Sequence, residues 1–144
     1  MMAWLLDTNV FSELLRPQPD EGVCRWLNAQ DEQQLYVCSV TQAEMLLGVA
    51  LMPDGRRKTA LQTQVEILLS QDLAGRMLAF DSSAAQAYAR LVMARRQMGR
   101  PIAQADAQIA AVAAAHGLTV ATRNQKDFEG VGVPLLNPWV VSGH

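Results

Sequence analysis

Four carboxylates in this sequence have positions that are typical of a metal-ion site. Asp7 directly follows a short apolar run, Glu44 lies just inside a predicted helix, Asp106 lies at the start of an alanine-rich helix, and Asp127 follows another apolar run. Carboxylates that lie close together repel one another, so the pKa of each rises unless a cation compensates. The chain offers only two histidines and no closely paired cysteines, and oxygen ligands favour a hard divalent ion. The predicted ion is therefore Mg²⁺ or Mn²⁺.

Each of these acids also has an explanation that involves no chemistry. Asp7 is placed to cap the next helix, although a carboxylate directly after Trp4-Leu5-Leu6 is costly to bury without a partner. Glu44 completes Thr41-Gln42-Ala43-Glu44, which has the pattern of a capping box. Asp106 lies in a first helical turn, where the macrodipole stabilises an acid by about 0.3–1 kcal/mol. Asp127, taken alone, is an ordinary loop acid.

Other polar residues lie near the same predicted strand ends. Side chains of this group could bond carboxylates, water or phosphate, and turn or cap roles explain each of them nearly as well. The supporting candidates are Thr8, Asn9, Ser39, Thr122 and Asn124. Asp81 is assigned to capping the helix that starts at Ser82 and is kept as a reserve candidate. His116 is interpreted as a helix C-terminal cation, and His144 as a chain end.

Short apolar runs and longer amphipathic stretches alternate along the chain. The runs predicted as buried strands are Ala3–Leu6, Leu35–Cys38, Met77–Phe80, Leu118–Ala121 and, as a last short strand, Pro134–Leu136. Helical spacing fills the stretches between them, and Gly99 with Pro101 and Gly117 mark two helix ends. The predicted class is α/β, with a central, mostly parallel sheet of four to five strands flanked by helices. Ligands of such sheets bind at the carboxyl ends of the strands, where the four acids are expected to meet.

Length and composition set limits on the number of domains, the use of cysteine and the cellular compartment. With 144 residues, half of them hydrophobic, the chain is predicted to form a single domain over residues 1–144. Cys24 and Cys38 have no disulfide or zinc spacing and are predicted packing residues. No apolar stretch is long enough to span a membrane and no secretory leader is recognised, so a cytoplasmic protein without a membrane partner is expected.

A net charge of −2 argues against a general positive field that holds nucleic acid, so any such contact must be local. One stretch without acids, between Ser82 and Ala105, carries several arginines, and a solvated helix face explains each of them equally well. These residues are Arg90, Arg95, Arg96 and Arg100.

Taken together, four segments resemble the PIN-domain family, and specifically the VapC or FitB type of toxin from bacterial toxin–antitoxin pairs. The resemblance covers nearly the whole chain, and its specificity comes from four motifs in order at family-like spacing. The segments are Leu5–Val10, Ser39–Glu44 with Leu46 and Gly48, Ile102–Ala111 followed by His116 and Gly117, and Thr122–Phe128.

This resemblance implies an endonuclease for single-stranded RNA that uses Asp7, Glu44, Asp106 and Asp127 around Mg²⁺ or Mn²⁺. It also implies a small antitoxin protein that blocks the site, and a homodimer formed through helices. Two other hypotheses remain. A phosphoryl-transfer enzyme fits less well, because Asp7-Thr8-Asn9 lacks a second acid two residues after the first. The other is a non-catalytic interaction module, in which the acids only cap helices.

Overall fold

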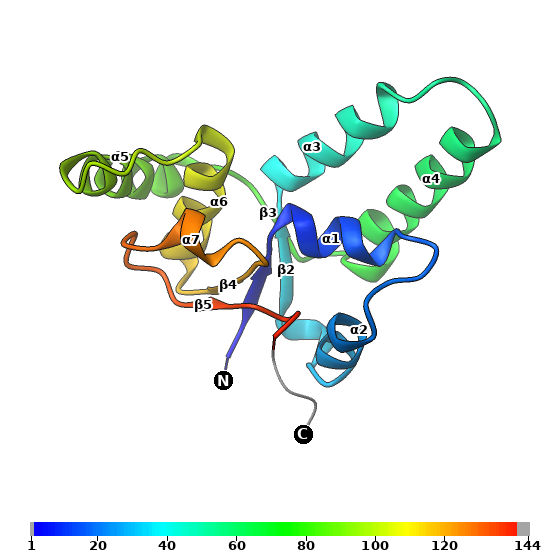
Figure 1. Cartoon of the computed structure of the whole chain (residues 1–144), viewed down its shortest axis with the longest axis horizontal. Helices are drawn as coiled ribbons and strands as arrows, with labels where there is room; N and C mark the ends of the chain where they lie inside the picture. The colour runs from blue at the N-terminus through cyan, green and yellow to red at the C-terminus, as the bar shows by residue number, and fades with distance from the viewer. Residues whose placement is uncertain (1, 141–144) are drawn as a thin grey trace.

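Five parallel strands form one sheet in the computed structural model, which describes residues 2–140 (Figure 1). The strands are β1 (Trp4–Leu6), β2 (Leu35–Cys38), β3 (Met77–Leu78), β4 (Thr119–Ala121) and β5 (Leu135–Leu136), in the spatial order β3-β2-β1-β4-β5. Every pairing between these strands is parallel. The α/β class is therefore confirmed, and the predicted strands are present, four of them one or two residues shorter than expected. His144 lies outside the described residues.

Helices cover both faces of the sheet. One face packs against α1 (Thr8–Leu14), α2 (Glu21–Asn28), α3 (Ser39–Ala50) and α4 (Arg56–Ile67), and the other against α5 (Ser82–Gln97), α6 (Gln104–His116) and the short α7 (Gln125–Phe128). A 3₁₀ turn, η1 (Glu32–Gln34), precedes β2, and a π-helical turn, η2 (Leu68–Asp72), continues α4.

Alternation along β1 explains the two cores. Leu5 points into the core beneath α5 and α6, whereas Trp4 and Leu6 point into the core beneath α1 to α4. Trp4 packs edge to face against Trp26 of α2, with 5.0 Å between ring centroids. Because β1 is covered on both faces, its backbone is held rigidly, and so is the residue that follows it, Asp7.

Helix ends follow the sequence signals at Asp81, Gly99 and Gly117 and depart from them at Glu44. Asp81 caps α5 by accepting a hydrogen bond from the backbone N–H of Ala84 at 3.0 Å, as predicted. Gly117 ends α6 in the left-handed conformation, with φ of 67°. The prediction that Thr41 and Glu44 form a capping box was wrong, because α3 already begins at Ser39 and both residues lie inside it. Glu44 is therefore free of a capping role.

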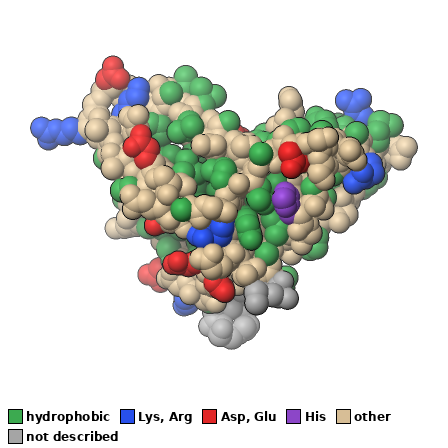
Figure 2. Space-filling view, turned by 180° about the vertical axis from the view of Figure 1, so that it is seen from behind, with side chains coloured by type: hydrophobic (Ala, Val, Ile, Leu, Met, Phe, Trp, Pro, Cys, Tyr) green, Lys and Arg blue, Asp and Glu red, His purple; other side chains and the backbone are tan. Residues whose placement is uncertain are grey.

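The helices extend beyond the sheet on two sides. In Figure 1, α3 and α4 form one arm, α5 and α6 form the other, and the carboxyl end of β1 lies between them. The space-filling view in Figure 2 shows the molecule hollowed at its upper edge between these arms. Across residues 2–140, no helix is long and apolar enough to cross a membrane.

Candidate active site at the carboxyl ends of the strands

The strand order reverses between β1 and β4, and two candidate residues meet at this point. Asp7 follows β1, Thr122 follows β4, and the Thr122 hydroxyl donates a hydrogen bond to Oδ2 of Asp7 at 2.8 Å. The backbone N–H of Asp7 also bonds to the carbonyl of Ala121 at 3.0 Å, which continues the pairing between the strands. The first candidate acid therefore lies at the topological switch point, where ligands of α/β sheets bind.

Asp7 is a buried carboxylate that accepts several hydrogen bonds. Besides Thr122, the backbone N–H of Thr8 donates to Oδ1 at 2.8 Å and the amide of Asn9 donates to Oδ2 at 3.0 Å. Burial nevertheless raises the pKa of Asp7, and the charges of Glu44 and Asp127 raise it further, while the bonds from Thr122 and Thr8 lower it. Asp7 does contact the first turn of α1, as its capping explanation predicted. The capping bond uses only Oδ1. Capping therefore does not explain why Oδ2 accepts bonds from Asn9 and Thr122.

A chain of hydroxyl groups connects Glu44 to α1. The Thr8 hydroxyl donates to Oε1 of Glu44 at 2.6 Å and lies 3.0 Å from the hydroxyl of Thr41, which is fully buried. Because Thr8 has one hydroxyl proton and gives it to Glu44, Thr41 must be the donor toward Thr8. This chain orients an exposed glutamate toward the end of β1.

Asp106 is the acid whose protonation is most perturbed. It lies in the first turn of α6, is half-buried, and makes no side-chain hydrogen bond to another residue of the described range. Burial is the main reason that its pKa rises to about 6, and the charges of Asp7, Asp127 and Glu44 add to the effect. A carboxylate that is desolvated, repelled by three others and left without a donor is one that a cation would stabilise.

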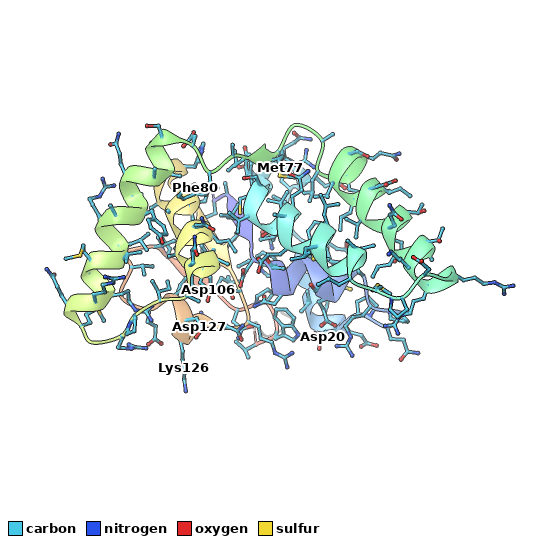
Figure 3. All side chains as sticks on the ribbon, turned by 90° about the horizontal axis from the view of Figure 1, so that it is seen from above. Asp20, Met77, Phe80, Asp106, Lys126 and Asp127 are labelled. Carbon is cyan, nitrogen blue, oxygen red and sulfur yellow. The ribbon has the colours of Figure 1, made fainter. Side chains whose placement is uncertain are left out.

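Asp127 lies on α7, which packs against α6, and Figure 3 shows it on the same side of the molecule as Asp106. Its side chain is exposed and does not line the pocket described below, although its charge raises the pKa of both Asp7 and Asp106. Among the four acids, Asp127 is thus the outer member.

A buried arginine holds α7 in place. Arg95 of α5 is 4% exposed and donates from Nη1 to the carbonyls of Asp127 at 2.8 Å and Glu129 at 3.0 Å. Its Nε donates to the carbonyl of Arg100 at 2.6 Å. The sequence interpretation of Arg95 as a solvated side chain or a local nucleic-acid contact was wrong, because the guanidinium satisfies backbone carbonyls. Arg90 and Arg96 are exposed, and Arg100 pairs with Glu129 at 3.4 Å.

An open pocket of about 430 Å³ brings most of the candidates together. Asp7, Glu44 and Asp106 line it with Thr8, Asn9 and Asn124, and so do Ser12, Glu13, Arg16, Arg123 and Trp139. Within residues 2–140, no three His, Cys, Asp or Glu side chains converge closely enough to form a closed metal cage. Mg²⁺ seldom needs one, since it keeps several waters and binds through one or two carboxylates and substrate phosphate. The donor set fits such an ion, because three carboxylates line an open hollow and burial raises the pKa of two of them, Asp7 and Asp106.

The supporting residues divide into two groups. Asn9 and Thr122 bond directly to Asp7, and Thr122 also accepts a bond from the backbone N–H of Asn124 at 3.0 Å. The Ser39 hydroxyl instead accepts a bond from the backbone N–H of Phe80 at 3.2 Å and does not line the pocket.

Sequence reasoning missed three residues of this region. Thr41 was assigned to a capping box, Arg123 lay in a motif without a role of its own, and Trp139 was not among the candidate site residues. Only Thr41 carried a sequence signal, as a polar residue at four-residue spacing from the buried Met45 and Val49 of α3.

The fold and the pocket define the class: a parallel α/β protein with an acidic, oxygen-lined pocket at its switch point. The sequence model of the family described as "PIN domain" matches residues 4–133. VapC ribonuclease Y4jK of Sinorhizobium fredii and Toxin FitB of Neisseria gonorrhoeae are each 44% identical to this chain over 135 residues, which are 94% of it and 96% and 97% of those proteins. A solved structure titled as FitAB bound to an IR36 DNA fragment superposes with a TM-score of 0.91 at 43% identity, covering 98% of this chain and 99% of that one. The chain belongs to the PIN-domain family.

Proposed function

We propose that this protein is a metal-dependent endoribonuclease that cleaves phosphodiester bonds of single-stranded RNA, and that it is the toxin of a toxin–antitoxin pair. The observation that carries the proposal is that Asp7, Glu44 and Asp106 line one pocket at the switch point of the sheet, where burial and neighbouring acids raise the pKa of Asp7 and of Asp106. The names of its relatives, a VapC ribonuclease and a FitB toxin, support the same activity.

The proposed ion is Mg²⁺ or Mn²⁺, held mainly by Asp7 and Asp106. Both carboxylates are desolvated and both have raised pKa values, so a divalent cation removes an electrostatic cost that they share. Glu44 is the third oxygen donor or orients a water, and Asp127 is an outer ligand. When bound, the ion would activate water and neutralise charge on the phosphate in an in-line displacement.

The remaining chemistry is assigned to side chains of the chain itself. Thr122 and Asn9 hold the Asp7 carboxylate in one orientation through Oδ2. Thr8 holds Glu44 so that its other carboxylate oxygen remains available to accept a proton from water. Thr122 and Asn124, at the end of β4, are the groups proposed to position the substrate phosphate.

Two protein contacts belong to the proposal, a small antitoxin and a second copy of the chain. Supporting them is a group of exposed apolar side chains on α3 and at its C-cap, where Leu46, Leu47 and Leu51 are 47%, 59% and 74% exposed. Clustered exposed leucines are typical of protein interaction surfaces. The FitAB title of the superposed structure names a pair of proteins, which supports an antitoxin partner for this chain.

The proposal is tested by mapping cleavage of single-stranded RNA by the purified protein with Mg²⁺, Mn²⁺ or EDTA. We expect cleavage that requires the metal and is lost in Asp7→Asn. The exposed Asp72→Asn serves as a matched control, because it removes the same charge far from the pocket and should cleave like the wild type. A fully active Asp7→Asn protein would contradict the assignment.

A further inference from the structure

The acidic pocket has a second side with the opposite charge. Arg123, which follows β4, lines this pocket together with Trp139, and its guanidinium carbon lies 5.1 Å from the centre of the Trp139 ring. The Arg123 side chain is exposed, and within residues 2–140 it makes no ion pair and no side-chain hydrogen bond. The other pocket arginine, Arg16, is paired with Glu13 at 3.2 Å. Arg123 is therefore the uncommitted cation of this pocket.

Hydrogen bonds fix the backbone around Arg123 and Trp139. The N–H of Arg123 donates to the side-chain oxygen of Asn9 at 3.3 Å, which links this residue to the β1 end of the site. The side chain of Asn137 donates to the carbonyl of Arg123 at 3.3 Å and accepts from the N–H of Trp139 at 2.9 Å. Trp139 also packs against the core beneath α1 to α4. The indole is thus supported from the core side, and the backbone of Arg123 is held next to it.

A cation beside an aromatic ring at the border of the pocket suits a nucleic-acid substrate. An RNA chain must approach Asp7, Glu44 and Asp106, whose charges repel its phosphates, so attraction has to come from the border of the pocket. Single-stranded RNA is recognised chiefly through unstacked bases, which stack on aromatic rings or on the plane of an arginine guanidinium. The guanidinium carbon of Arg123 lies over the Trp139 ring, and the exposed side chain leaves the guanidinium open to a base from the solvent side.

We infer that Arg123 and Trp139 form a nucleotide subsite next to the cleaved bond, in which one unpaired RNA base stacks on the guanidinium while Trp139 supports it from behind. The inference rests on the proposed function, since it names how that site holds its substrate. Because the planar guanidinium is the stacking surface, lysine is not an equivalent replacement. Stacking and cation–π contacts of this kind correspond to about 5- to 50-fold in binding.

The test compares Arg123→Gln, Arg123→Lys and Trp139→Leu with the control Arg90→Gln, which removes the same charge on α5 outside the pocket. Steady-state cleavage of single-stranded RNA gives kcat and KM, and fluorescence anisotropy with a short phosphorothioate-linked 2′-O-methyl RNA gives Kd without cleavage. We expect Arg123→Gln to raise KM and Kd about 5- to 50-fold with kcat and thermal stability unchanged. Arg123→Lys and Trp139→Leu should each show part of this loss, and Arg90→Gln none.

The outcomes separate this subsite from the proposed activity. A wild-type protein that binds the oligonucleotide through Arg123 and does not cleave RNA would overturn the activity and retain the subsite. Unchanged KM and Kd in Arg123→Gln, or full retention of binding in Arg123→Lys, would overturn the stacked subsite while leaving a cleaving enzyme. Failure of the wild type to bind the oligonucleotide would overturn the subsite as well.

Discussion

Replacing Asp106 by asparagine should make the metal-free protein more stable. The carboxylate is half-buried, makes no side-chain hydrogen bond to another described residue, and lies near three other acids that repel it. The Asp106→Asn change keeps the size and shape of the side chain and removes only its charge. Few mutations isolate an electrostatic cost so cleanly.

The magnitude follows from the pKa. Burial and the neighbouring acids raise the pKa of Asp106 from 3.8 to about 6, and each pKa unit corresponds to about 1.4 kcal/mol. The upper limit is therefore about 3 kcal/mol, and solvent screening of a half-exposed side chain reduces it to about 1.5 kcal/mol. The loss of a favourable charge in the first turn of α6 subtracts about 0.5 kcal/mol. A net gain of about 1 kcal/mol, or about 4 °C in Tm, is expected.

The direction of the pKa shift of Asp106 determines how the stabilisation by Asp106→Asn depends on pH. The folded protein binds a proton at Asp106 more tightly than the unfolded chain does, because its folded pKa is raised. The contribution of Asp106 to the free energy of unfolding therefore falls as pH rises from about 4 to about 6, and it stays low above that. The advantage of Asp106→Asn should be full above pH 6 and vanish below pH 4.

Urea denaturation in EDTA, at several pH values between 4 and 8, measures this difference. The control is Asp72→Asn, an exposed acid outside the pocket, whose free energy of unfolding should match that of the wild type. Adding Mg²⁺ at pH 7.5 should stabilise the wild type by about 2.7 kcal/mol at one hundred times its Kd and stabilise Asp106→Asn less. An Asp106→Asn protein that is less stable than the wild type at pH 7.5 without metal would refute the electrostatic reasoning.

Four further results are expected. Asp7→Asn should lower kcat for RNA cleavage by at least about 100-fold while circular dichroism stays unchanged, because a charged ligand is lost from a structured site; near-normal kcat would contradict its role. Thr122→Val should shift the acidic limb of the pH–rate profile upward, because the Thr122 hydroxyl lowers the pKa of Asp7, and an unshifted limb would exclude this coupling. Arg95→Met should reduce the free energy of unfolding by about 2–4 kcal/mol in urea, since three backbone carbonyls lose their donor; a loss below about 0.5 kcal/mol would be inconsistent with that burial. In sedimentation, the wild type should be dimeric and the double variant Leu47→Glu with Leu51→Glu shifted toward monomer, and a monomeric wild type would contradict the homodimer.

Much of the candidate site could be predicted because it depends on local rules. Asp7 follows a strand, Asp106 begins a helix, and a parallel sheet brings the carboxyl ends of its strands to one edge. These placements need only the element order and the direction of the strands. Glu44 was more difficult, since its partner Thr8 is 36 residues away and the contact depends on how α1 crosses α3.

Two interpretations failed because tertiary structure overrode a local signal. Thr41 to Glu44 has the pattern of a capping box, yet α3 starts directly at the end of β2 with buried Cys38 as its N-cap. Arg95 lies in a run of arginines that resembles a solvated face, and only the packing of α7 reveals the carbonyls that it binds. The partners that decide these roles, Thr8 for Glu44 and the carbonyls of α7 and Glu129 for Arg95, lie 32 to 36 residues away in the sequence.

Asp7, Glu44 and Asp106 are the residues proposed to hold a divalent ion at the end of β1. Anomalous diffraction from crystals soaked in Mn²⁺ tests this proposal directly. We expect a manganese peak in this pocket, in contact with carboxylate oxygens of Asp7 and Asp106, that disappears in crystals of Asp106→Asn. A pocket without manganese at saturating Mn²⁺, or an ion bound only at other carboxylates, would contradict it.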